Sequence, residues 1–178
     1  MPRYTAINKD TAIKLTITNG PEPPEAAMHP LHKKNPSLGN KPVMMGKNLL
    51  IEKEDAETLE LGQKVTLMNW GNIKITKKIA KAGKLLELEA TYDEADKDWK
   101  GTVKLTWICN DPNTTVELKM IEFDHLINKE KVEEEDKVEN CVNDPSKFEY
   151  NFIAEGCVRN LNKGDHFQFE RKGFMFVD

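Results

Sequence analysis

Short stretches with an apolar side chain at every second position constrain the fold of this chain more than any other feature. Residues 13–18 (IKLTIT) and 84–93 (KLLELEATYD) alternate in this way, as strands with one buried and one solvent-facing side do. Such stretches recur roughly every ten residues with turns between them, and only residues 54–63 and 129–140 offer short helices. We therefore predict an all-β fold, a sandwich or barrel of antiparallel strands with few short helices.

Other segments also predict short strands, and one long loop separates two of them. Residues 29–42 (HPLHKKNPSLGNKP) contain three prolines and one glycine, so we predict a long irregular loop there. Gly62 is expected to end the helix that begins near residue 54. The remaining strands are predicted at residues 4–7, 48–51, 64–81, 101–109 and 115–127.

The closing stretch GDHFQFERKGFMFVD changes its apolar register. Phenylalanines occupy positions 167 and 169 and then positions 174 and 176, which predicts one strand with a β-bulge at Gly173. The bulge would place Arg171 beside Gln168 and Glu170 on the open face. Three planar polar groups of this kind can match the edge of an unpaired base; an ordinary surface strand with a Glu–Arg pair is the alternative.

Composition excludes several classes of protein. The chain has 178 residues, 38% of them hydrophobic and 31% charged, which fits a globular protein of one ordinary domain or two small ones. No run of about 18 apolar residues and no signal-peptide pattern is present, so we expect no membrane segment. The three cysteines form no CxxC pair, which is typical of a reducing, cytoplasmic compartment.

Charge is segregated along the chain although the net charge is only −4. Residues 71–86 hold five lysines and no acid, and residues 28–53 hold five lysines and one acid. Residues 87–98 and 129–140 hold six acids each. This pattern predicts one basic and one acidic surface, with scattered solvated lysines as the alternative. The net charge argues against indiscriminate binding of duplex DNA.

No arrangement of residues indicates catalysis. The chain lacks a glycine-rich phosphate loop, a nucleophile elbow and a complete zinc set. His29 and His32 lie three residues apart, but no cysteine or acidic cluster completes a metal site around them. The sequence is therefore interpreted as a binding module without catalytic or metal-binding residues.

Several motifs occur in a fixed order and carry a resemblance. They are HKKNPSLGNKPV (32–43), LLIEKEDAETLELGQKVTLMNWGNIKI (49–75), KLTWI (104–108), FDHLI (123–127), VND-SK-E within 142–149 and KGDHFQFERKGFMFVD (163–178). Together with the opening PRYTAI they resemble the C-terminal anticodon-binding region of glutamyl-tRNA synthetase of the archaeal and eukaryotic type. Its close relative is glutaminyl-tRNA synthetase.

The resemblance implies that residues 1–178 form a tRNA anticodon-binding region made of two tandem antiparallel β-barrels. The first barrel would comprise residues 1–52 and 128–178, and the second, residues 53–127, would be inserted between them. These boundaries, at about residues 53 and 127, come from the family.

The resemblance also assigns roles to individual residues. In the glutaminyl relative, the arginine of the PR entry and the Gln and Glu of the QFER strand read the middle anticodon base, a uridine. The matching positions are Arg3, Gln168 and Glu170, with Arg171 adjacent. Arg3 and Gln168 can donate to the two uridine carbonyls, and Glu170 can accept from N3–H or hold an arginine in place.

Other positions depart from the glutaminyl pattern. Thr66 and Met68 occupy positions where that relative has arginines that contact the first anticodon base, and Thr58 replaces an arginine that contacts the third. These losses favour the glutamyl assignment. Asn69 and Trp70 are our candidates for local contacts with the RNA, and a place in the barrel core is the alternative for Trp70.

Given an RNA ligand, the lysines of the two basic segments are expected to contact tRNA phosphates, which adds affinity without sequence information. They are Lys33, Lys34, Lys41, Lys74, Lys77 and Lys78. The acidic segments would face away from the RNA.

The resemblance finally implies a larger parent protein. The catalytic signatures of the family, of the HIGH and KMSKS kinds, are absent, so we expect a fragment of a cytoplasmic glutamate–tRNA ligase. The parent would use ATP and Mg²⁺, whereas the fragment would need no cofactor. Its partner would be glutamate tRNA, with other synthetases or a scaffold protein as further partners. Glutaminyl or dual tRNA specificity, or a protein-docking β-barrel, are the alternative functions.

Overall fold

The computed structural model describes residues 1–124, 137, 139, 142 and 146–178, and strands dominate this part of the chain. The helical elements in it are α1 (Lys53–Glu57) and the 3-10 helices η1 (Pro36–Leu38) and η2 (Gly156–Asn160). The predicted all-β fold is confirmed. The strands are β1 (Arg3–Tyr4), β2 (Ala6–Asn8), β3 (Ile13–Ile17), β4 (Glu25–Pro30), β5 (Asn40–Met45), β6 (Asn48–Ile51), β7 (Lys64–Leu67), β8 (Gly71–Lys81), β9 (Lys84–Asp93), β10 (Val103–Leu105), β11 (Trp107–Cys109), β12 (Thr115–Phe123), β13 (Lys147–Glu155), β14 (His166–Phe169) and β15 (Gly173–Phe176).

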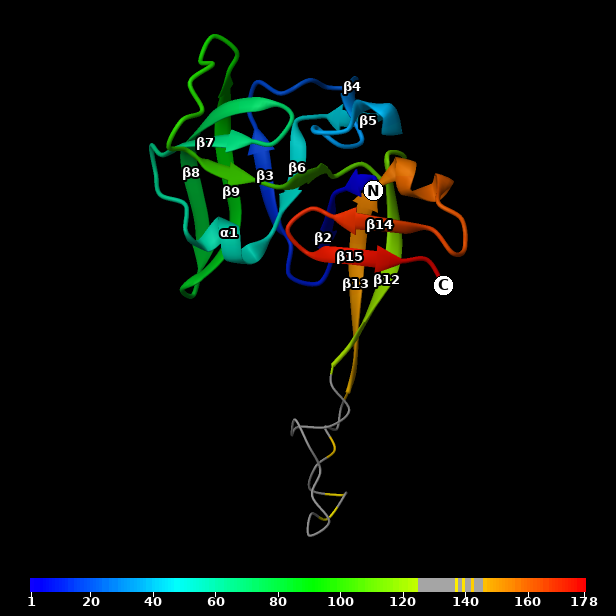
Figure 1. Ribbon diagram of the computed structural model, residues 1–178. Coiled ribbons are helices and arrows are strands. Elements are labelled where there is room, and N and C mark those ends of the chain that lie inside the picture. The colour runs from blue at the N-terminus through cyan, green and yellow to red at the C-terminus, as the bar shows by residue number, and fades with distance from the viewer. Residues whose placement is uncertain (125–136, 138, 140–141, 143–145) are drawn as a thin grey trace.

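A seven-stranded sheet forms the larger part of the molecule and curls into a barrel-like shape (Figure 1). Its strand order is β10-β7-β8-β9-β3-β6-β11. Alternate residues of these strands point inward, and Leu15, Ile51, Leu67, Leu88 and Leu105 are almost completely buried. Each such side chain contributes about 2 kcal/mol of burial free energy, so this core accounts for much of the stability of the fold.

Two three-stranded sheets, β12-β13-β2 and β1-β14-β15, pack around a second core. Aromatic side chains fill it: the rings of Tyr4 and Phe167 meet edge to face at 5.8 Å, and those of Phe167 and Phe169 at 4.9 Å. A small buried cluster of Ile7, Leu50 and Ile108 connects this part to the seven-stranded sheet. The two cores are therefore packed against each other.

The pairing of the strands differs in one respect from the predicted antiparallel arrangement. The pairs β1–β14, β3–β9 and β7–β10 run parallel, so the sheets are mixed. The seven-stranded sheet also combines strands from both sides of residue 53. The boundaries at about residues 53 and 127 stay predictions.

The predicted irregular loop at residues 29–42 is wrong at both ends. Strands β4 and β5 form a two-stranded antiparallel sheet in which Pro30 pairs with Asn40, so only residues 31–39 form the loop. Each strand of a two-stranded sheet has a free edge, where a proline without an N–H group is tolerated. The helix predicted at 54–63 is also shorter, because α1 ends at Glu57. Most of the predicted helical segment 129–140 lies outside the described residues.

The closing stretch is a hairpin rather than one bulged strand. Phe169 pairs with Gly173, so β14 and β15 run antiparallel around a turn of residues 170–172. Arg171 and Gly173 have left-handed backbone angles, with φ of 64° and 129°, which make this tight reversal possible. The hairpin leaves Phe167 and Phe169 buried on one face and directs Phe174 and Phe176 to the exposed face, so the change from odd to even positions does not mark a bulge.

Candidate nucleic-acid interface

The β1-β14-β15 sheet brings three of its side chains into one row. Arg3 pairs with Gln168, and Gln168 pairs with Phe174 on the other side. Paired residues in a sheet project from the same face, and neighbouring strands lie about 5 Å apart. Phe174 is 76% exposed, so a flat aromatic surface borders the two polar groups. We call these residues together with Glu170 the β14 face.

Backbone hydrogen bonds fix the position of the β14 face. The Gln168 amide donates to Pro2 O at 3.0 Å, and the Glu170 amide donates to Tyr4 O at 2.9 Å. Arg3 N donates in turn to Leu31 O at 2.9 Å. The structure therefore places Arg3 and Gln168 on neighbouring strands and Glu170 in the turn directly after β14, although most of the sequence separates Arg3 from the other two.

Two polar atoms of the β14 face are buried without a partner. Within the described residues, Arg3 Nε and Glu170 Oε2 have no hydrogen-bond partner. A buried polar group left unpaired costs about 1–3 kcal/mol. One donor and one acceptor with unused capacity suit a ligand that presents both acceptors and donors.

Arg171 does not lie free beside Gln168. Its guanidinium donates to both carboxylate oxygens of Asp55, at 2.6 and 2.8 Å, and to Thr106 Oγ1 at 3.4 Å. The hydrogen bonds from Arg171 and the charge of Asp55 raise the pKa of the guanidinium, against the opposing effect of burial. The predicted base contact of Arg171 stays a prediction, and in this structure its planar fork is occupied by Asp55.

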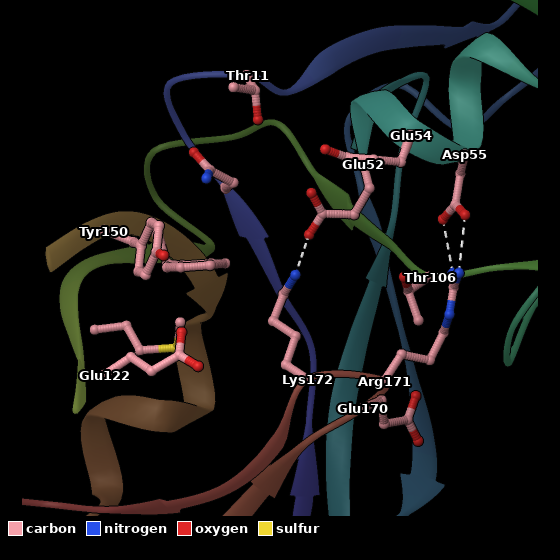
Figure 2. Close-up of a pocket in the computed structure, with 13 residues that line it drawn as sticks. Thr11, Glu52, Glu54, Asp55, Thr106, Glu122, Tyr150, Glu170, Arg171 and Lys172 are labelled. Carbon is pink, nitrogen blue, oxygen red and sulfur yellow. Dashed lines mark hydrogen bonds and ion pairs between the residues drawn. The ribbon is translucent and has the colours of Figure 1, made fainter. Parts of the chain in front are cut away.

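A polar pocket of about 370 Å³ lies between α1 and the turn after β14 (Figure 2). Lys172 contacts Glu52 there, and its ammonium also lies 4.9 Å from the ring centre of Phe152. Figure 2 shows Glu170 next to Arg171, on the side away from Asp55. The pairs of Arg171 and Lys172 thus connect the turn that carries Glu170 to the larger barrel.

A groove of about 460 Å³ lies beside the turn between β7 and β8. Its lining includes Asn69, Trp70, Trp99 and Lys33. Asn69 has a left-handed φ of 65°, a backbone conformation that asparagine tolerates well. Trp70 packs against Trp107 at a centroid distance of 5.2 Å, as expected for a core residue. We call this the Trp99 groove.

Two of the three positions where arginines are expected in the glutaminyl relative, Thr66 and Met68, also line the Trp99 groove, whereas Thr58 does not. Thr66 is buried, and its hydroxyl lies 2.5 Å from Asn72 Oδ1 and 2.6 Å from Thr102 Oγ1. Met68 O accepts a hydrogen bond from Trp107 Nε1 at 2.8 Å. Thr66 therefore serves internal hydrogen bonding, and the groove keeps its shape through these bonds.

The predicted phosphate-binding lysines fall into different environments. Lys33 and Lys34 are exposed on the loop after β4, and Lys74 and Lys77 are exposed on β8, which Figure 1 places at the opposite side of the molecule from β14. Lys78 is half-buried and donates to Leu59 O at 2.6 Å. The six lysines are therefore not gathered in one patch.

Lys41 corrects the prediction most clearly. It is 3% exposed, and its ammonium lies 2.6 Å from Glu155 Oε2. The reason is its place on β5, where Lys41 and Val43 occupy inward positions and Pro42 an outward one. An ammonium in this position cannot reach a phosphate, so Lys41 is not among the contacts that we propose below.

The two histidines near the loop have lowered pKa values. Burial, Lys33 and Lys41 together lower the pKa of His29, and burial and Arg3 lower the pKa of His32. His32 Nδ1 accepts a hydrogen bond from Lys34 N at 3.1 Å. In the part of the chain that the structure describes, no three His, Cys, Asp or Glu side chains gather as a metal site, and no helix is long and apolar enough to cross a membrane.

Sequence reasoning missed two exposed aromatic residues at these sites, Phe174 and Trp99. The signal for Trp99 was an isolated tryptophan in the charged run DKDWKG, where no core position is expected. The exposure of Phe174 could not be predicted from the sequence, because it depends on the pairing of Phe174 with Gln168 in the hairpin.

Comparison with known proteins decides the family. A family model described as the anticodon-binding domain of class I tRNA synthetases (E and Q) matches residues 1–93, and a second model with the same description matches residues 104–178. The chain belongs to this family. The resemblance that the motifs predicted is therefore confirmed.

Individual relatives are glutamate enzymes of eukaryotes. The chain is 37% identical over 178 residues to the cytoplasmic glutamate–tRNA ligase of Saccharomyces cerevisiae and 38% identical over 179 residues to the probable cytoplasmic enzyme of Schizosaccharomyces pombe. These matches cover 99% of the chain but only 24% and 25% of those relatives. The bifunctional glutamate/proline–tRNA ligase of Mus musculus is 36% identical over 180 residues, which is 99% of this chain and 12% of that protein.

Proposed function

We propose that this anticodon-binding chain acts within a glutamate–tRNA ligase and that its β14 face binds the middle uridine of the glutamate anticodon. The observation that carries the proposal is the row of Arg3, Gln168 and Phe174, with buried atoms of Arg3 and Glu170 left unpaired. The names of the relatives support the choice of glutamate tRNA.

The chemistry of uridine suits this face. Its base edge presents two carbonyl acceptors on either side of one N3–H donor. Arg3 and the Gln168 amide donate to the carbonyls, while the Glu170 carboxylate accepts from N3–H. Cytidine carries an amino donor where uridine carries a carbonyl, so one protein donor would face another donor and stay unpaired.

Stacking and phosphate contacts complete the proposed interface. Phe174 offers its exposed ring to the base, a contact worth about 1–3 kcal/mol per stacked base. Lys33 and Lys34 are exposed on the loop after β4 and contribute charge, whereas the exposed Lys74 and Lys77 on β8 would contact phosphates away from the β14 face. Lys78 contributes from a half-buried position.

The parent protein would couple this recognition to aminoacylation in the cytoplasm. Its catalytic part would use ATP and Mg²⁺ to activate glutamate and then esterify the 3′ end of the tRNA, and neither group is assigned to the present chain. Other synthetases or a scaffold protein are proposed as further partners, since one relative is named a bifunctional glutamate/proline ligase.

The proposal is tested by measuring binding to the anticodon stem-loop of glutamate tRNA with uridine or cytidine in the middle position, at two salt concentrations. We expect the wild type to prefer uridine by about tenfold, because the wrong base leaves a buried polar group unpaired. Arg3→Ala and Glu170→Gln should abolish this preference without changing the salt dependence. Arg159→Ala is the matched control, since Arg159 is exposed and donates to Thr115 O. Equal binding of both RNAs by the wild type would overturn the proposal.

A further inference from the structure

The turn after β14 carries one acid and two cations in a row. Glu170 is followed directly by Arg171 and Lys172, so in an unconstrained chain either cation can pair with the carboxylate. Such a local pair would occupy the acceptor oxygens that the proposed base contact needs. In the structure Glu170 Oε2 is buried and has no hydrogen-bond partner among the described residues. The residues that draw the two cations away therefore decide whether Glu170 is available to a ligand.

Two acidic residues at the start of α1 hold the two cations. Arg171 donates to both carboxylate oxygens of Asp55, and Lys172 contacts the carboxylate of Glu52. Figure 2 shows both pairs on the α1 side of the turn and Glu170 on the side away from Asp55. The cations and the carboxylate of this turn thus point in different directions.

Glu52 is a rigid partner for Lys172. Ile51 directly before it is fully buried on β6, between β3 and β11 of the seven-stranded sheet. The carbonyl oxygen of Glu52 accepts a hydrogen bond from Ala56 N at 3.0 Å, within the first turn of α1. The side chains of Lys172 and Glu52 are only 20% and 13% exposed. An ammonium in this position needs a counter-charge, because an unpaired charge that is shielded from water is strongly unfavourable.

Without the charge of Glu52, the Lys172 ammonium would take another carboxylate. Glu54 and Glu122 also line the pocket, but both are exposed, and exposed ion pairs add little stability. Glu170 lies two residues away on the same turn and has a buried oxygen without a partner. Pairing there would satisfy both buried groups at once, so the freed ammonium would occupy Glu170.

We propose that Glu52 is a specificity-determining positioning residue: by binding the Lys172 ammonium, it keeps the Glu170 carboxylate available to the N3–H group of the middle base. Glu52 acts through Lys172 and does not contact the RNA. This inference rests on the proposed function and deepens it. The choice of base on the β14 face thus depends on a residue that belongs to the larger barrel.

The experiment measures binding of the uridine and cytidine stem-loops to three variants. Glu52→Gln removes the charge with little change in shape, and we expect the preference for uridine to fall from about tenfold to near equality. Lys172→Met should keep the preference, because no competing ammonium remains. Glu52→Gln combined with Lys172→Met should recover it for the same reason. If the pair only clamped the turn, the second substitution would not repair the first, so recovery is specific to the proposed role.

Glu57→Gln is the matched control, because Glu57 is an acid of the same helix that pairs with Lys53 at 3.8 Å and does not line the pocket. It should keep the preference for uridine. A second measurement needs no RNA: the carboxyl-carbon NMR resonance of Glu170 should move in Glu52→Gln and return in the double variant. Urea denaturation of each variant establishes that it is folded under the conditions of the binding measurement.

The two proposals fail in different ways. If the wild type prefers uridine and Glu52→Gln keeps this preference, the inference about Glu52 alone is wrong. A preference that Lys172→Met loses, or that the double variant does not recover, would overturn it too. If the wild type binds both RNAs equally, the β14 face proposal is wrong. The Glu170 resonance then still tests the role of Glu52: an unmoved resonance in Glu52→Gln would overturn this inference as well, and a moved one would support the pairing with Lys172.

Discussion

The ammonium of Lys41 lies 2.6 Å from Glu155 Oε2, and only 4% and 11% of the two side chains are exposed. The pair joins β5, which follows the loop at residues 31–39, to β13 of the second core. Lys41 also lies 5.4 Å from the ring centre of Tyr4. Burial raises the pKa of Glu155, while Lys41 acts in the opposite direction.

Breaking this pair should destabilise the protein. Removal of one partner from a buried pair leaves an uncompensated charge and costs about 3–5 kcal/mol. We expect Lys41→Met to lower the free energy of unfolding by this amount in urea denaturation. Lys41→Met combined with Glu155→Leu should recover part of the loss, because no charge then remains buried. A stable Lys41→Met variant with a reduced salt dependence of RNA binding would instead support a phosphate contact.

The alternating pattern predicted the strands because burial of one face of a sheet requires an apolar side chain at every second position. Leu15 and Ile17 are inward on β3 and Lys14 is outward, as the sequence alone indicated. The same alternation predicts that Lys41 is buried, because it lies two residues before the inward-facing Val43. The prediction of a phosphate contact followed the charge of Lys41 and not its position on the strand. Its partner Glu155 is far away in the sequence, and no local pattern predicts such a pair.

The candidate site was predictable only in part. The motif resemblance selected Arg3, Gln168 and Glu170. The structure places the first two on adjacent strands and Glu170 in the turn that follows. The partner of Arg171 was not predictable, because phenylalanines at odd and then even positions also fit a hairpin whose second strand directs its phenylalanines outward. Asp55 is also far from Arg171 in the sequence. Neither Trp99 nor Phe174 belongs to a recognisable motif, so their exposure required coordinates.

The bidentate pair of Arg171 and Asp55 allows a test of whether Arg171 positions the turn or contacts the base. If it positions the turn that carries Glu170, Asp55→Asn and Arg171→Lys should reduce the preference for uridine to the same extent. The pair is partly exposed, so each variant should lose no more than about 1 kcal/mol of unfolding free energy. Stem-loop binding and urea denaturation of both variants provide the measurement. A loss of preference confined to Arg171→Lys would indicate direct base contact.

The exposed lysines should determine the salt dependence of RNA binding. For single strands the slope of log K against log salt changes by about 0.7 for each phosphate contact. We expect Lys33→Ala and Lys34→Ala each to reduce the slope by about this amount without changing the preference for the middle base. Lys9→Ala serves as the control, since Lys9 pairs with Glu117 at 2.8 Å. Unchanged slopes in both loop variants would contradict the assignment.

Glu149 gives a pH-dependent prediction outside the RNA site. Hydrogen bonds from Lys147 and then from Lys119 lower the pKa of its carboxyl from 4.5 to about 2. Because the folded pKa is depressed, the stabilising effect is complete above the unfolded value of 4.5 and is lost as the pH falls towards about 2. Carboxyl-carbon NMR titration should show this low pKa.

Replacing each of the two lysines that contact Glu149 provides the control for this titration. Lys147→Met should raise the Glu149 pKa more than Lys119→Met does, since the hydrogen bond from Lys147 has the larger effect. A pKa near 4.5 in the wild type would show that these exposed pairs do not persist in solution.

Phe174 provides the sharpest test of the β14 face, because the chain contains a matched residue. Phe174 and Phe123 are 76% and 75% exposed, so their replacement by alanine should affect the unfolding free energy little and similarly. Only Phe174 lies next to Gln168 in the strand register. We expect Phe174→Ala to weaken stem-loop binding by about 1–3 kcal/mol, whereas Phe123→Ala should leave it unchanged.

Since stacking tolerates any base, Phe174→Ala should weaken binding of the uridine and cytidine stem-loops equally and keep the preference that Arg3 and Glu170 determine. Isothermal titration with both RNAs checks both parts: equal binding by the two alanine variants would remove Phe174 from the interface, and a lost preference would mean that its ring orients the base for the polar groups.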